Sequence, residues 1–287
     1  MSKEQILERE RRWARPTALA VLGTVILFVG TAVMASGEVS QAEDSAEFLE
    51  AFADDTSRQL LIAVLQAIGF ALLAFPLFYL FQAASSRSER MRKALIGLTV
   101  AGPLFLAVAW ITRYFAFDAA ASDFIGQTPD PGQSADALAD DVIEEQAAFG
   151  VTQGFNFAGI LGLIFGVTYT AFYAMRTGLL TRFWGTLGMA LAVATLFLGT
   201  PFGVLIFAIA IGLIAADRWP GGRPAAWDAG VGMPWPKPGE EPPEPPADDA
   251  APGLPEGFGS DPAGEASPAD DGEVPSTNGP RKRKRRA

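Results

Sequence analysis

Cysteine and histidine are both absent from the 287 residues of the chain. Their absence excludes disulfides, thiol nucleophiles, thiolate zinc sites, imidazole bases and haem ligation through those side chains. The long apolar blocks also contain no Asp, Glu or Lys, so a carboxylate proton relay inside a membrane has no carrier. We therefore predict no catalytic, cofactor-binding or metal-binding residues, and the composition gives no basis for assigning an enzyme.

Apolar residues are abundant and are concentrated in blocks. They make up 49% of the chain, which also contains 21 Phe. An uncharged stretch of about 18 or more apolar residues can cross a hydrocarbon core of roughly 30 Å. Such blocks predict an all-α fold, a polytopic membrane helix bundle. The five uncharged or nearly uncharged blocks are Thr17–Ala35, Leu60–Ala84, Ala94–Phe117, Ala147–Met175 and Phe183–Ala216.

The fifth block is too long for one ordinary crossing. Its 34 residues would form a straight helix of about 51 Å. Two crossings of about 24 Å each would be slightly short and would need a thinned bilayer. The sequence LGTPFG at residues 198–203 favours a turn, because Gly199 suits the end of a helix and Pro201 the first turn of the next. The alternative is one long helix with a proline kink.

Charges are segregated along the chain, although the formal total is −10. Lys3 and four arginines precede the first block, whereas the following segment, Ser36–Gln59, has Arg58 alone against seven acids. The connection Ala84–Lys93 carries four basic residues, and Asp118–Gln146 has eight acids without Lys or Arg. Because cytoplasmic loops are enriched in Lys and Arg, we expect a cytoplasmic amino terminus and alternating sides thereafter.

The segment Pro220–Pro280 holds 15 of the 21 prolines, interleaved with Gly, Ala, Asp and Glu. It cannot bury a core, which predicts a disordered, partly polyproline-II tail. Trp227 and Trp235 are exceptions within this segment. They indicate a short motif that folds back on the membrane or docks a partner, or else only loose adhesion to the membrane interface. We expect the basic end of the tail to attract anionic lipid headgroups, with RNA and the acidic tail as alternative partners. This end is Arg281, Lys282, Arg283, Lys284, Arg285 and Arg286.

A basic tail indicates a cytoplasmic carboxyl terminus. An odd number of crossings would place it outside, so we predict that the fifth block crosses twice and that the bundle has six transmembrane helices. The alternatives are five crossings, or a cleaved signal peptide in place of the first helix. The predicted organisation is a cytoplasmic amino terminus (1–16), a six-helix transmembrane domain (17–219) and the tail (220–287), in the cell membrane with both termini cytoplasmic.

The two acidic outer segments contain helix signals of their own. Asp44 and Glu47 resemble a capping box, and Ser134–Gln146 has apolar residues four positions apart. We expect short amphipathic helices near the membrane. Two interpretations of their acidic residues are open. The acids bind a cation or a basic partner, or they only keep these segments out of the bilayer.

One charged residue, Arg113, lies inside a predicted crossing, about one turn from the outer end of its helix. An embedded charge is a functional candidate, although an arginine near the boundary also reaches outward to water or pairs with Asp118. Three amides are predicted to share the outer half of the bilayer with it: Gln66, Gln153 and Asn156. We predict a polar cluster of these four residues, which binds a ligand or joins helices by hydrogen bonds.

The block Ala147–Met175 also contains Gly159, Gly162 and Gly166, which leave one helix face smooth. Such a face permits close approach of another helix, inside the bundle or in a dimer. Packing inside the bundle is the favoured interpretation.

The six-crossing pattern, the stretch PAAWDAGVGMPWP and the acidic Pro-rich tail ending in RKRKRR resemble uncharacterised multi-pass membrane proteins of high-GC bacteria. The resemblance implies a plasma-membrane location and no particular activity. Our first hypothesis is a non-enzymatic membrane anchor or interaction protein, whose partners are membrane lipids. The alternative is a small transporter or ligand-binding bundle that uses the predicted polar cluster.

Overall fold

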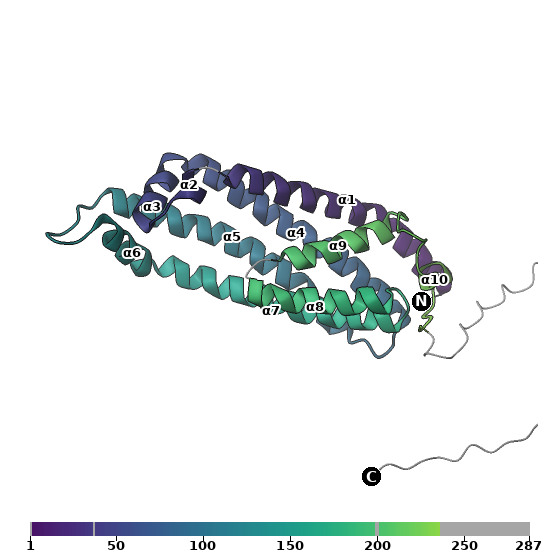
Figure 1. Ribbon diagram of the computed structural model, residues 1–287. Helices are drawn as coiled ribbons and strands as arrows, with labels where there is room; N and C mark the ends of the chain where they lie inside the picture. Colours follow the sequence, from purple (N-terminus) through teal and green to yellow (C-terminus); the bar gives the residue numbers. More distant parts are fainter. Residues whose placement is uncertain (1, 37, 199–200, 236–287) are drawn as a thin grey trace, which may run out of the picture. The chain divides into compact units, whose positions relative to one another are not determined.

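The computed structural model describes residues 2–36, 38–198 and 201–235, and this part of the chain is helical without strands (Figure 1). In these residues, four helices are long and apolar enough to cross a membrane. One of these spans also includes the short 3-10 helix η1 (Lys93–Leu95), which directly precedes its α-helix. The four helices are α1 (Lys3–Ala35), α4 (Thr56–Arg87), α5 (Ile96–Ile125) and α7 (Ala147–Arg176). The all-α prediction is confirmed, with four rather than six candidate spans by length and composition.

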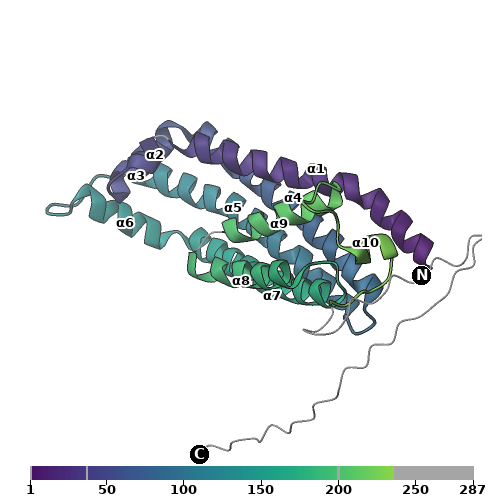
Figure 2. The same ribbon diagram turned by 45° about the vertical axis from the view of Figure 1, so that its right-hand side comes forward.

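Two shorter apolar helices and several small helices complete the described part. The former are α8 (Arg182–Leu198) and α9 (Phe202–Ala215). The latter are α2 (Glu38–Gln41), α3 (Ser45–Asp54), α6 (Ala135–Glu145) and α10 (Ala225–Ala229). The apolar helices lie side by side, with α2, α3 and α6 at one end and the amino terminus and α10 at the other (Figures 1 and 2).

The amino-terminal residues are part of α1 rather than a separate segment. The Ser2 hydroxyl accepts a hydrogen bond from the Gln5 amide at 3.3 Å, and the Gln5 side chain accepts one from the Ser2 amide at 3.0 Å. This capping box starts a helix that runs without interruption through Pro16 into the first apolar block. Residue 16 is therefore no boundary in the secondary structure.

Helices α5 and α7 pack with their backbones in close contact. A Cβ atom added to Gly102 would lie 2.6 Å from the backbone nitrogen of Leu163, and one added to Gly162 would lie 2.7 Å from the Cα of Gly102. Gly159 and Gly166 have equally close neighbours on α5. The smooth face of α7 is thus used inside the bundle, as the favoured interpretation predicts, because only glycine lets two backbones approach this closely.

The fifth apolar block forms two helices. Helix α8 ends at Leu198 and α9 begins directly after Pro201, while Gly199 and Thr200 lie outside the described residues. The two helices pack antiparallel, since Gly188 faces Phe207 and Gly203 faces Leu191. Their 17 and 14 residues correspond to about 25 and 21 Å of helix, less than the roughly 30 Å hydrocarbon core.

The two predicted amphipathic helices are present as α3 and α6, and they pack on each other. The side chains of Asp44 and Ser134 cap them, at 2.8 Å from the Glu47 amide and 3.1 Å from the Ala137 amide. The amide of Ser45 at the start of α3 donates to an Asp136 carboxylate oxygen on α6 at 2.8 Å. Their apolar faces join the end of α5 in a small core of Leu49, Phe52, Tyr114, Phe124, Leu138 and Val142.

Candidate functional site

All four residues of the predicted polar cluster line one cavity of about 350 Å³, which we call the Arg113 cavity. Gln66 comes from α4, Arg113 from α5, and Gln153 and Asn156 from α7. The remaining wall is mostly apolar and includes Phe28, Phe70, Leu106, Trp110, Phe117, Phe149, Ile160, Phe202 and Leu205. The structure therefore brings together side chains that are as much as 90 positions apart in the sequence.

Arg113 is held between aromatic rings. The carbon atom of its guanidinium group lies 5.7 Å from the Trp110 ring centroid and 5.4 Å from that of Phe117. Such contacts contribute about 0.5–2 kcal/mol each. The described residues give Arg113 no ion-pair partner, so the alternative of a pair with Asp118 is not formed. Helix α5 continues to Ile125, so Arg113 also lies further from the end of its helix than the apolar block indicates.

The three amides differ in their surroundings. Gln66 donates from Nε2 to the Thr31 hydroxyl at 2.7 Å, and Thr31 donates onward to the Leu27 carbonyl at 2.8 Å. Gln66 thus joins α4 to α1, as expected for an amide that links helices. The side chains of Gln153 and Asn156 form no hydrogen bond with another described residue. Two amides and one guanidinium are therefore available at the cavity wall.

Threonines are the part of this site that the sequence analysis missed. Thr152 lines the cavity and donates to the Thr112 hydroxyl at 3.0 Å, which joins α7 to α5 beside Arg113. Thr195 of α8 and Pro201 at the start of α9 close another side. Threonine is an ordinary residue of apolar helices, so its presence alone indicates no site. Only the helical spacing of these threonines from the predicted amides could have indicated them.

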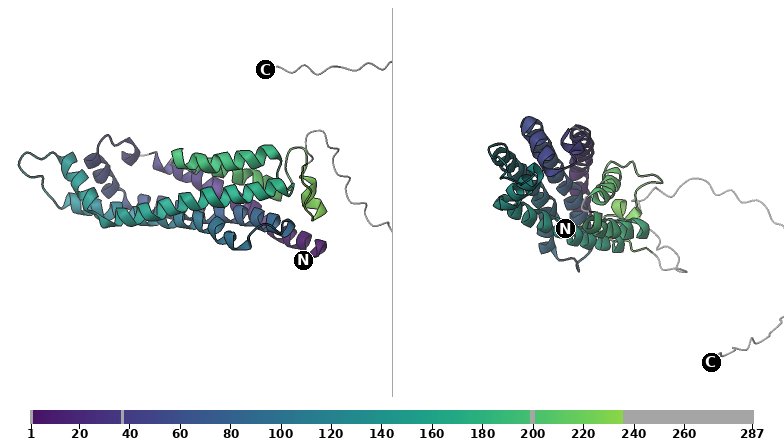
Figure 3. Two further views of the ribbon diagram at one scale, coloured as in Figure 1. Left: turned by 90° about the horizontal axis from the view of Figure 1, so that it is seen from below. Right: turned by 60° about the vertical axis from the view of Figure 1, so that its left-hand side comes forward.

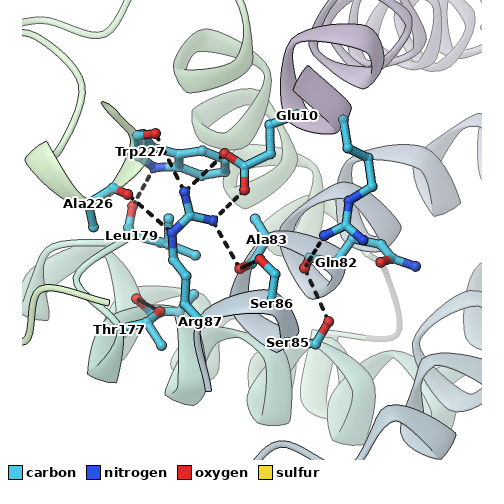
Figure 4. Close-up of polar contacts among 12 residues, drawn as sticks. Glu10, Gln82, Ala83, Ser85, Ser86, Arg87, Thr177, Leu179, Ala226 and Trp227 are labelled. Carbon is cyan, nitrogen blue, oxygen red and sulfur yellow. Dashed lines mark hydrogen bonds and ion pairs between the residues drawn. The ribbon is translucent and has the colours of Figure 1, made fainter. Parts of the chain in front are cut away.

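A second polar centre lies near the other end of the bundle and is shown in Figure 4. The guanidinium of Arg87, near the end of α4, binds both carboxylate oxygens of Glu10 on α1, with 3.0 Å between Nη2 and Oε2. It also donates to the carbonyls of Ala83 and Ala226 at 3.1 Å. The side chains are 0% and 6% exposed for Arg87 and Glu10. This bidentate pair is buried and well supplied with hydrogen bonds, the geometry such a pair requires.

Trp227 of α10 completes this second centre, and we call Glu10, Arg87 and Trp227 the clasp. Trp227 is 1% exposed, donates from Nε1 to the Leu179 carbonyl at 2.9 Å and stacks on Tyr79 with 5.4 Å between centroids. Trp235 donates from Nε1 to the Leu180 carbonyl at 2.7 Å.

One residue of the clasp, Trp227, belongs to the segment predicted to be part of the disordered tail. Residues 220–235 pack on the bundle, whereas the tail from Pro236, including the basic end Arg281–Arg286, lies outside the described residues.

No protein-family model, curated protein or solved structure matches the chain.

Proposed function

We propose that the chain is a cell-membrane protein that crosses the bilayer six times, with both termini in the cytoplasm. The break between α8 and α9 and their antiparallel packing support two crossings of the fifth block. Both helices expose large apolar side chains suited to lipid, among them Phe197 and Ile206. Because α8 and α9 are shorter than the hydrocarbon core, the bilayer becomes thinner around them, or flanking polar side chains extend to its surface.

Sidedness is proposed from charge. The end of the bundle that carries α10 and the start of α1 also carries the connections after α4 and α7 (Figure 3), which are basic. The segments at the other end, residues 38–55 and 126–146, are acidic. Because Lys and Arg are retained in the cytoplasm, the end that carries α10 is the cytoplasmic one. The Arg113 cavity then faces the outer half of the membrane.

The absence of native cysteine makes this topology directly testable. Single substitutions Ser122→Cys, Thr200→Cys and Gly279→Cys are treated in intact cells with a maleimide that cannot cross the membrane. We expect labelling at positions 122 and 200 and none at 279 until the cells are permeabilised. Labelling of position 279 from outside would exclude a cytoplasmic carboxyl terminus, and together with labelling of position 122 it would contradict the proposed six crossings.

We propose further that the Arg113 cavity binds a small anion with an apolar body. The observation that carries this proposal is an arginine without an acidic partner among the described residues, beside two amides that bind no described residue and beside aromatic walls. An arginine at the centre of a membrane helix costs about 2.5–3.5 kcal/mol on insertion scales, and less near the boundary. A bound carboxylate would offset this cost through charge-assisted hydrogen bonds, while the aromatic wall contacts the apolar part of the ligand.

Phenylacetate is a suitable probe, with phenylethanol as its uncharged counterpart. Calorimetric titration of the full-length chain in nanodiscs should show at least about tenfold tighter binding of the anion, the effect of one charge-assisted hydrogen bond. Arg113→Gln should remove this preference. Arg58→Gln is the matched control, because Arg58 lies near the same end, pairs with Asp55 at 3.4 Å and does not line the cavity. Equal affinity in wild type and Arg113→Gln would contradict the proposal.

The clasp supports a second candidate function, a membrane anchor that presents its tail to lipids or a protein partner. Trp227 and Trp235 tie the start of the tail to Leu179 and Leu180. Substituting all four predicted site residues, Gln66, Arg113, Gln153 and Asn156, distinguishes the two candidates. Loss of folding alone favours the anchor, whereas loss of anion binding by a well-folded protein favours the binding protein.

A further inference from the structure

A second, larger pocket of about 690 Å³ opens at the end of the bundle that carries the clasp. Its lining comes from the end of α4, the connection after it, the end of α7, the start of α8 and the segment after α10. This pocket is separate from the Arg113 cavity, with which it shares no residue. Its described lining residues include no Asp or Glu and four arginines, which are Arg87, Arg90, Arg176 and Arg182.

The charge of this arginine pocket is not cancelled by the clasp. Glu10 neutralises Arg87, whose side chain is fully buried. Arg90 and Arg176 are exposed to the pocket opening, and the guanidinium carbon of Arg176 lies 4.7 Å from the Phe172 ring centroid. The described residues place neither Arg90 nor Arg176 in an ion pair. Among the described residues, two arginines therefore line the pocket without an acidic partner.

The walls of the arginine pocket are held by hydrogen bonds between distant segments. The Tyr173 hydroxyl of α7 donates to the Arg90 carbonyl at 3.3 Å, which fixes the connection after α4. The Met233 amide donates to the Thr177 carbonyl at 2.9 Å. Trp235, 39% exposed, forms one wall and is tied to Leu180. These hydrogen bonds hold the backbone segments that carry the guanidinium groups, beside an aromatic side chain.

We propose that the arginine pocket binds the phosphate of an anionic phospholipid headgroup. Arginine forks match phosphate oxygens in pairs, and basic pockets between membrane helices are suited to lipid headgroups. The pocket lies where helices α4 and α7 end, the level of a membrane–water boundary if these helices cross the bilayer. Trp235 and Tyr173 supply the amphipathic rings that favour this level. The proposal requires a membrane location but no ligand in the Arg113 cavity.

The test measures the thermal midpoint of the full-length chain in detergent during three titrations. The probes are dihexanoyl phosphatidylglycerol, dihexanoyl phosphatidylcholine and inorganic phosphate. We expect a saturable rise with phosphatidylglycerol only. Arg90→Gln together with Arg176→Gln should raise the half-saturating concentration at least about tenfold, as expected for lost charge-assisted hydrogen bonds. Each single variant should raise it less, and either serves as the test if the double variant fails to fold.

The matched control is Arg11→Gln together with Arg12→Gln. These residues are exposed on the cytoplasmic part of α1, Arg12 pairs with Glu8 at 3.8 Å, and neither lines the pocket. The control removes the same charge from the same end and should leave the half-saturating concentration unchanged. An equal loss in the control would show general attraction to basic residues and overturn the proposal. A rise with inorganic phosphate at the same concentration would assign the pocket to free phosphate instead.

Discussion

Arg87 and Arg113 lie on neighbouring helices and have opposite surroundings. Arg87 is fully buried, pairs with Glu10 and donates to carbonyls of α4 and α10. Arg113 lines a cavity, forms cation–π contacts with two aromatic rings and has no ion pair with a described residue. The first arginine has its hydrogen-bonding capacity used within the protein, whereas the second keeps its capacity for a ligand. The comparison predicts that Arg87 contributes to stability and Arg113 to binding.

The largest effect is expected from breaking the buried pair. Glu10→Ala leaves the Arg87 guanidinium buried without its carboxylate, which typically costs about 3–5 kcal/mol of unfolding free energy. Denaturant titration in mixed micelles measures this loss. Glu8→Ala on the same helix is the control, because its pair with Arg12 is exposed and should contribute about 1 kcal/mol or less. A cost below that of the control would show that Arg87 finds other partners.

Removing the aromatic member of the clasp should have the next largest effect. Trp227→Ala deletes a buried ring that stacks on Tyr79, and we expect a loss of about 3 kcal/mol in unfolding free energy. The same change at Trp235, which is 39% exposed, should cost about half as much or less. Limited proteolysis of the segment after α9 provides a second measurement. Unchanged cleavage in Trp227→Ala would contradict docking of α10.

A smaller effect is expected at the α5–α7 contact, which supports Arg113 and two of the amides. Gly102→Ala would place a Cβ against the backbone of α7, and such overpacking costs about 1–3 kcal/mol. Gly154→Ala is the control on α7, since no described atom of another helix lies within 4 Å of the added carbon. That control should be neutral or slightly stabilising, because alanine favours helix. Equal midpoints for the two variants would argue against the close contact.

The smallest effect on stability is expected at Arg113 itself. Arg113→Gln removes two cation–π contacts, and it also removes the cost of an unpaired charge. We expect a net change of about 1 kcal/mol or less in either direction, measured by the same denaturant titration. A loss as large as that of Glu10→Ala would assign Arg113 a structural role and weaken the proposed function.

Much of the secondary structure was predictable from local signals. The apolar blocks predict the long helices, and the sequence around Pro201 predicts the break between α8 and α9. Asp44 and Ser134 predict the starts of α3 and α6. That Gln66, Arg113, Gln153 and Asn156 line one cavity was also predictable, because charged and amide side chains in the apolar helices are few and their positions along the helices place them at one level. Their role as a binding site stays a prediction.

The sequence by itself determined where helices form and which polar residues lie within them. These properties depend on residues close together in the chain and on how favourably their side chains transfer from water to an apolar environment. Only the tertiary structure decided which arginine has an acidic partner, since Glu10 and Arg87 are 77 positions apart. It also decided that Trp227, in a Pro-rich segment, is buried beside Tyr79. Pairing and burial depend on how helices far apart in the chain pack together, and composition carries no record of that packing.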